Sequence, residues 1–137
     1  MTTENRDSNF SLGEFQSLVD EVLIRHKSIL DILSKIQESS ARVNRAVAKA
    51  STSCGCIKIC AEKPEIPDDI TFSKLKAHMS DHVEGELCTT CEEKIKQEIS
   101  TNLFYLFALC NTFDFDTEEM TRDYYQQLKL LGKYGLL

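Results

Sequence analysis

The feature that most constrains the fold is a regular series of apolar residues in the first third of the chain. Between Glu14 and Ser53 there is no Gly or Pro, so nothing in this stretch interrupts a helix. Steps of three and four residues alternate along the series, which is the spacing of a heptad seam. Ten of its twelve positions are apolar, and the series is Leu12, Phe15, Val19, Val22, His26, Ile29, Leu33, Ile36, Ser40, Val43, Val47 and Ala50. The pattern predicts one helix of up to about forty residues, or two collinear helices with a break near Arg25–Ser28.

A seam of this length needs a surface that covers it. It either packs on later helices of the same chain, or forms in part a seam between two copies or with another protein. The expected partner is therefore a second copy of the chain or another protein, bound through the long helix. The heptad spacing also suggests a coiled coil as the form of that contact.

The remainder of the chain shows further helical patterns and no strand pattern that competes with them. Thr71 with Lys74–Glu86 predicts a short helix. The stretch from Glu92 to Thr112 predicts a longer helix, whose second half is strongly apolar and belongs in the core. The sequence therefore predicts an all-α fold.

Capping residues and breakers divide the chain. Ser11 is the predicted N-cap of the first helix, Asp116 that of the last helix, and Gly132 is its predicted C-cap. We expect a disordered tail over residues 1–10 and a single helical domain over residues 11–137. That domain comprises the long helix at 11–52, a Cys- and Pro-containing loop at 53–70 and a helical part at 71–137.

The composition is that of a globular chain. Of the 137 residues, 42% are hydrophobic and 28% are charged, with a net charge of −6. Nucleic-acid binding usually requires a basic surplus, so we expect no nucleic-acid partner. No apolar run approaches the ~18 residues that span a bilayer, and the start, MTTENRDSNF, lacks the apolar stretch of a signal peptide. We expect a cytoplasmic protein without a membrane partner, in a compartment where disulfides are rare.

Two cysteine pairs then point to a metal. A CxC motif supplies Cys54 and Cys56, and a CxxC motif supplies Cys88 and Cys91. Structural Zn²⁺ sites take four tetrahedral ligands, and tight turns present sulfurs in pairs. Gly55 suits such a turn because it adopts positive φ without steric cost. We predict one structural Zn²⁺ held by these four thiolates. An iron–sulfur cluster accepts the same ligands and remains an alternative.

Other assignments of these groups stay open. Cys60 is an alternative partner in the first pair, and His78 and His82 have the i, i+4 spacing that lets two histidines on one helix face hold a metal. Two further interpretations of the motifs remain. Cys88 and Cys91 could form a redox pair, or the cysteines could serve only as small buried side chains. Cys110 lies in an apolar helical pattern and is predicted to be a core residue.

A longer stretch resembles a known family. From Glu84 to Met120 the chain reads EGELCTTCEEKIKQEISTNLFYLFALCNTFDFDTEEM. This resembles the MazG-type all-α nucleoside triphosphate pyrophosphohydrolases, whose signature has a GEL triplet, then E-L-G-D-x-L-x-Y-L, then an acidic turn into a final helix. The matching pieces are Gly85–Leu87, Glu98–Leu106, and Phe115–Asp116 with the acids that follow. The resemblance implies that the long helix packs on a MazG-like helical bundle.

The acids that serve catalysis in that family are only partly present. There, two facing helices offer four acids in an ExxE…ExxD arrangement to Mg²⁺, which bridges the nucleotide phosphates. Glu86 and Glu98 match two of the four positions. Thr101 stands at the position of the Asp, and His82 and Val83 stand at the upstream pair.

Two functions follow from these patterns. The favoured one is a non-catalytic, zinc-clamped helical protein of MazG-like fold that binds a partner or itself, because the thiol set is complete and the acid set is broken. The alternative is a Mg²⁺-dependent enzyme that converts a nucleoside triphosphate to the monophosphate and pyrophosphate, with Glu86 and Glu98 as its catalytic metal ligands. A nucleotide is an expected partner only in the second case. A redox sensor at Cys88 or Cys91 is a third reading.

Overall fold

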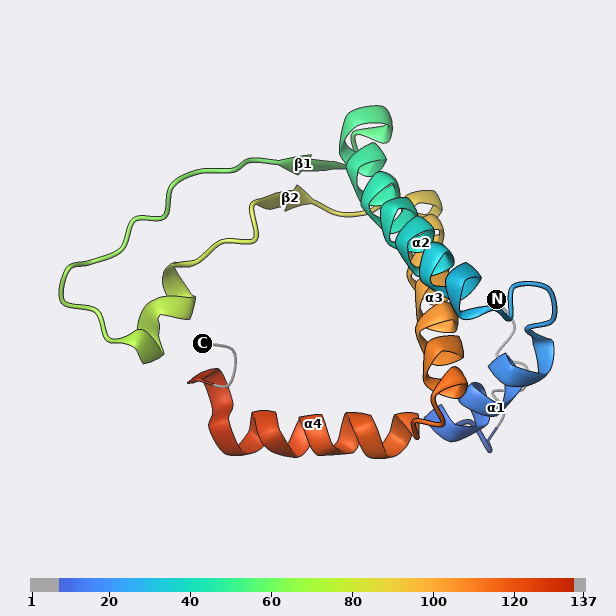
Figure 1. Cartoon of the computed structure of the whole chain (residues 1–137). Coiled ribbons are helices and arrows are strands. Elements are labelled where there is room, and N and C mark those ends of the chain that lie inside the picture. The colour runs from blue at the N-terminus through green and yellow to red at the C-terminus, as the bar shows by residue number, and fades with distance from the viewer. Residues whose placement is uncertain (1–7, 135–137) are drawn as a thin grey trace. The chain divides into compact units, whose positions relative to one another are not determined.

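The computed structural model describes residues 8–134 and is mostly helical, as expected for the all-α class (Figure 1). Residues 1–7 of the predicted tail lie outside this range. The α-helices are α1 (Leu12–Val22), α2 (Ile29–Lys49), α3 (Thr89–Thr112) and α4 (Thr117–Leu131). The shorter elements are the π-helical turn η1 (Ala50–Cys54), the strands β1 (Ile57–Ile59) and β2 (Val83–Gly85), and the 3₁₀-helices η2 (Phe72–His78) and η3 (Gly132–Tyr134).

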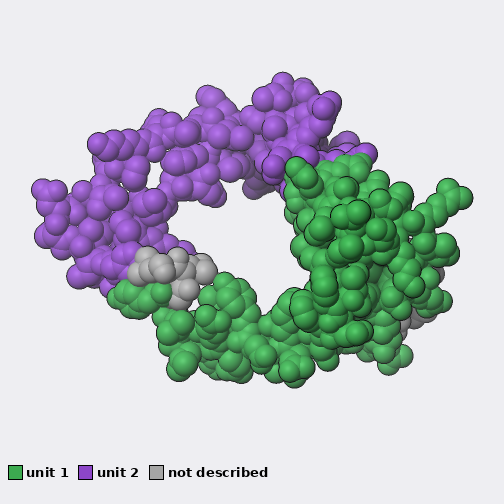
Figure 2. All heavy atoms as spheres, viewed as in Figure 1, with its two compact units in different colours: residues 1–40, 99–137 green, residues 41–98 purple. Residues whose placement is uncertain are grey.

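The chain divides into two compact units, which Figure 2 shows in different colours. Unit 1 combines residues up to Ser40 with those from Ile99 onward, and unit 2 comprises Ala41–Glu98. Each unit is described by itself below. Among residues 8–134, none of the helices combines the length and apolar character that crossing a membrane requires.

The hydrophobic core of unit 1 brings three helices together. Val19 from α1, Ile32 from α2, and Phe107 and Ala108 from α3 form its buried cluster. Phe15 packs against Phe107 with ring centroids 5.1 Å apart. Full burial of side chains such as Val19, Ile32 and Phe107 contributes roughly 1.5–3 kcal/mol each relative to leaving them exposed.

The first helix of the sequence prediction is two helices. The break covers residues 23–28, close to the predicted position, but the two helices are not collinear, because Val19 and Ile32 meet in one cluster. Ser28 starts the second helix, since its carbonyl oxygen accepts from the Ile32 N–H at 2.9 Å and its hydroxyl from the Leu30 N–H at 3.3 Å.

The break also shifts which residues of α2 face inward. Ile32 is 1% exposed, whereas the predicted seam residue Leu33 is 50% exposed. Ser39, rather than Ser40, is buried, and its hydroxyl accepts a hydrogen bond from the Asn102 amide at 3.0 Å. The prediction of a single continuous heptad seam is therefore wrong. The non-helical residues 23–28 interrupt the helix, so the residues of α2 that face inward do not continue the spacing set by α1.

The predicted caps are confirmed. The Ser11 hydroxyl accepts from the Glu14 N–H, and the Asp116 carboxylate accepts from the N–H groups of Glu118 and Glu119. Gly132 ends α4 with a positive φ of 56°. These local signals work because each satisfies backbone groups that a helix end leaves unpaired.

The prediction of a helix over residues 74–86, with no strands, is wrong. Helix η2 ends at His78, and β2 pairs antiparallel with β1 in the register Ile57 with Gly85 and Ile59 with Val83. The Ser80 hydroxyl accepts from the His82 N–H, and the Asp81 carboxylate accepts from the Val83 N–H. Such side-chain bonds to nearby backbone compete with helix formation, which explains why the helix stops before this point.

Candidate metal centre

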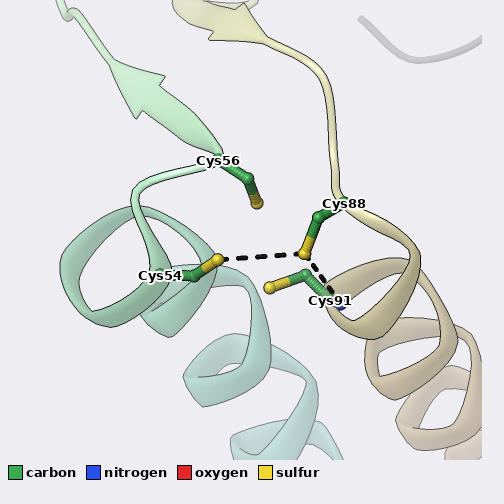
Figure 3. Close-up of side chains that lie close together, drawn as sticks. All are labelled: Cys54, Cys56, Cys88 and Cys91. Carbon is green, nitrogen blue, oxygen red and sulfur yellow. Dashed lines mark hydrogen bonds between the residues drawn. The ribbon is translucent and has the colours of Figure 1, made fainter.

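Unit 2 brings the four predicted cysteines together. The sulfur atoms of Cys54, Cys56, Cys88 and Cys91 all lie within 4.8 Å of one another (Figure 3). Cys54 closes the turn η1, Cys56 directly precedes β1, Cys88 directly precedes α3, and Cys91 lies in the first turn of α3. Two segments more than thirty residues apart in sequence therefore converge on one cluster, the thiol cluster.

The first pair is shaped by the way α2 ends. After α2 the chain widens into the π-helical turn η1, and Gly55 follows with φ 80°. The Gly55 N–H donates to the Ala50 carbonyl oxygen at 2.9 Å, and the Cys56 thiol donates to the same oxygen at 3.6 Å. This left-handed glycine lets two thiols that are separated by one residue point into the same space, as Figure 3 shows for Cys54 and Cys56.

The second pair is brought to the first by the two-stranded sheet. Gly85 lies opposite Ile57, next to Cys56, and the Cys60 N–H extends the ladder by donating to the His82 carbonyl oxygen at 2.8 Å. Gly85 has φ 87°, and a Cβ there would lie 2.8 Å from the Cys56 carbonyl oxygen. The strands can approach this closely only because residue 85 has no side chain.

The sulfur spacing suits a tetrahedral metal site. With a Zn–S bond of about 2.3 Å, the edge of a sulfur tetrahedron measures about 3.8 Å. The Cys54 and Cys88 sulfurs are 3.8 Å apart. The six cysteines are free thiols, and a disulfide would need a sulfur separation of about 2.05 Å. The Cys54–Cys88 pair thus has the spacing of a four-sulfur coordination shell, and the remaining sulfur pairs lie within 4.8 Å.

The electrostatics of the cluster favour a cation at its centre. The Cys91 N–H, which donates to the Cys88 sulfur at 3.4 Å, and the Cys91 thiol lower the pKa of Cys88 to about 7. The hydrogen bond with Cys88, followed by desolvation, raises the pKa of Cys91 to about 12. Without a cation, a thiolate at Cys88 therefore opposes ionisation of the Cys91 thiol. A bound divalent cation would favour ionisation of both thiols, since metal ligation requires the thiolate form.

The alternative ligands lie outside this cluster. Cys60 follows β1, and with His78 and His82 it lines a separate cavity of about 310 Å³ in unit 2. The prediction that the two histidines share one helix face is wrong, because η2 ends at His78 and His82 has φ 61°. Cys110 is 8% exposed in α3, which confirms it as a core residue, and desolvation raises the pKa of its thiol.

The two acids of the MazG-like pattern have different surroundings. Glu86 is exposed in the link between β2 and α3, so the expectation that it lies on a helix is wrong. Glu98 is only 5% exposed and its carboxylate pairs with the Lys94 ammonium at 2.7 Å. One buried, paired carboxylate and one exposed carboxylate on irregular backbone do not form the acid cluster that Mg²⁺ prefers.

Two contributors to the site were absent from the sequence prediction. The steric role of Gly85 is visible only once β2 is paired, since a glycine in a predicted helix carries no such signal. Lys94, in contrast, stands four residues before Glu98, and this i, i+4 spacing is a readable signal of their ion pair.

The fold and the thiol cluster together define a helical protein with a candidate four-cysteine metal centre. Comparisons of the chain with models of protein families, with curated proteins and with solved structures find no match.

Proposed function

We propose that the chain is a non-catalytic helical protein in which one Zn²⁺, bound by Cys54, Cys56, Cys88 and Cys91, clamps unit 2. The observation that carries this proposal is the convergence of four sulfurs within 4.8 Å of one another. The metal would join the end of α2 and the start of α3 through the turns that hold the cysteines. Zinc is the metal of choice because it prefers four tetrahedral thiolates.

The donor set supports a structural rather than a catalytic role. Catalytic zinc sites keep one coordination position for water or substrate, whereas four thiolates fill the shell. Unit 2 also has little apolar material of its own: in the described structure its buried hydrophobic residues are Ala50 and Ile57. A segment with so small a core gains much from a metal, because metal-binding free energy becomes folding free energy.

We further propose that the protein acts by association, with a second copy or another protein, through its first two helices. Several large apolar side chains of this region are exposed to solvent: Leu18, Val22, Ile24, Leu30 and Leu33. Five exposed large apolar side chains in one short stretch of the chain support an interaction surface there. The MazG-like arrangement of the helices and a cytoplasmic location, where thiols stay reduced, belong to the same proposal.

Metal analysis tests the clamp directly. In protein purified without oxygen, we expect about one zinc per chain and no iron, as measured by elemental analysis. Before chelation a thiol reagent should leave the four cluster cysteines unmodified; Cys60 reacts at once and buried Cys110 only on unfolding. After chelation the four become reactive. An iron content with visible colour would identify an iron–sulfur cluster instead, and metal-free protein with reactive cluster thiols would contradict the clamp.

The catalytic alternative makes a different prediction. With Glu98 paired to Lys94 and Glu86 on irregular backbone, we expect no pyrophosphate release from any of the common nucleoside triphosphates at millimolar Mg²⁺. The assay should include Glu98→Gln as a matched variant, to separate intrinsic turnover from a contaminating enzyme. Release that is present in the natural chain and absent in Glu98→Gln would restore the pyrophosphohydrolase assignment.

A further inference from the structure

A second cavity in unit 2 lies beside the thiol cluster, with Cys91 in its wall. It has a volume of about 380 Å³ and is bounded by the last turns of α2 and the first turns of α3. This volume is within the range of small-molecule sites, roughly 300–1,000 Å³. Cys91 of the proposed clamp and Glu98 of the acid motif are part of its wall, but the clamp assigns no ligand to this cavity.

Four cationic side chains line the cavity. Arg42, Arg45 and Lys49 follow one another at steps of three and four residues on α2, and Lys94 joins them from α3. Residues at these steps share one face of a helix. The chain as a whole has a net charge of −6, so this concentration of cations runs against its overall balance. Clefts lined by one sign of charge focus the field and attract ligands of the opposite sign.

One acid accompanies these cations. Glu98 also lines the cavity, is 5% exposed, and holds the Lys94 ammonium at 2.7 Å. It is the one acid among the residues that line the cavity, so the lining is cationic on balance.

The remaining wall has an apolar part. Ala46 of α2 and Ala50, the first residue of η1, line the cavity beside the cations, and Ala50 is 1% exposed. Arginine side chains add planar guanidinium groups that bind phosphate oxygens in pairs. The cavity therefore offers cationic donors for a dianion next to a small apolar surface.

We propose that this cavity binds a small phosphate-bearing molecule, a phosphomonoester whose dianion contacts Arg45, Lys49 and Lys94 and whose apolar portion lies against Ala46 and Ala50. The site is built from side chains of this chain alone and does not depend on the pyrophosphohydrolase assignment. It also stands if the thiol cluster binds a metal other than zinc.

A competing role for the same cations is charge balance. A Zn²⁺ with four thiolates carries a formal charge of −2, and Cys91 belongs to both the thiol cluster and the cavity wall. If the cations serve only to balance that charge, their loss weakens metal retention and leaves any phosphate affinity unchanged. The two roles are therefore separable by experiment.

The test uses the full chain as purified, with metal content measured, and two probes, inorganic phosphate and phenyl phosphate. Titration calorimetry at constant ionic strength should give saturable binding of both, with phenyl phosphate binding several-fold more tightly. Lys49→Gln should weaken both probes by about tenfold, the effect of one lost charge-assisted hydrogen bond. Lys74→Gln is the matched control, because Lys74 is an exposed lysine on η2 outside the cavity. Glu98→Gln should instead strengthen binding, since it removes the one opposing charge.

Three outcomes would overturn the proposal. One is the absence of saturable binding of either probe. Another is an equal loss in Lys49→Gln and Lys74→Gln, which would indicate general ionic attraction. The last is a Lys49→Gln protein that loses metal while phosphate binding is unchanged, which would assign the cations to charge balance. Repeating the titration after chelation, with folding checked by circular dichroism, separates failure of this site from failure of the clamp.

Discussion

Cys88→Ser is expected to release the bound metal and to destabilise the protein by on the order of 4 kcal/mol, the scale of losing a structural metal. Cys88 contacts two of the other three cysteines. Its sulfur lies 3.8 Å from the Cys54 sulfur and accepts a hydrogen bond from the Cys91 N–H. A serine oxygen is a poor substitute for a thiolate at a zinc site of this kind. Elemental analysis and thermal unfolding measure the two effects, with an expected fall in Tm on the order of 10 °C.

Cys60→Ser is the matched control for this experiment. It makes the same chemical change in unit 2 but outside the thiol cluster, so metal content and Tm should stay close to those of the natural chain. Chelation should then bring the natural chain and Cys88→Ser to the same Tm, because the difference between them is metal binding. A Cys88→Ser protein that keeps one zinc and its Tm would show that the cluster is not the source of stability.

Gly85→Ala is expected to have the second large effect, about 3 kcal/mol of lost stability, through two costs that act at the same residue. A left-handed φ of 87° is unfavourable for any residue with a Cβ. That Cβ would also lie 2.8 Å from the Cys56 carbonyl oxygen, so the two strands must move apart. Because this movement separates Cys56 from Cys88, metal affinity should fall with stability. Urea unfolding and competition with a chelator measure the two losses.

Gly55→Ala separates the two costs. Gly55 also has a positive φ, 80°, but a Cβ there would meet nothing within 4 Å. Its substitution should therefore cost only the conformational term, about 1 kcal/mol. Equal losses in Gly55→Ala and Gly85→Ala would mean that φ alone matters and that the close approach of the strands does not hold the two cysteine pairs together.

Local chemistry was readable where neighbouring residues decide the outcome. The caps at Ser11, Asp116 and Gly132 follow from short-range hydrogen bonds, and each lies where its residue type predicts. The helix predicted to begin near Glu92 is present as α3, beginning at Thr89. The choice of the four cysteines also came from spacing alone, and the structure places those four sulfurs together.

Features that depend on distant partners were missed or misplaced. Regular spacing suggested that Leu33 and Ser40 face inward, but the break after α1 rotates α2 so that Ile32 and Ser39 do so. Nothing in the local sequence reveals this phase, because it is set by packing on Phe107 and by the hydrogen bond from Asn102. The strands β1 and β2 were missed because three-residue strands carry too little periodicity to be recognised.

Side-chain periodicity, capping and ligand chemistry act over short spans. They were therefore enough to indicate a mainly helical chain, the start of the first helix, both ends of the last helix and the four thiols of the candidate metal site. The three-dimensional fold was needed to show which face of α2 is buried and that Gly85 permits the close approach beside Cys56. It also decided that Arg45, Lys49 and Lys94 line one cavity. These features arise from contacts between segments that are remote in sequence, and such contacts are selected by the packing of the whole unit rather than by any residue's own preference.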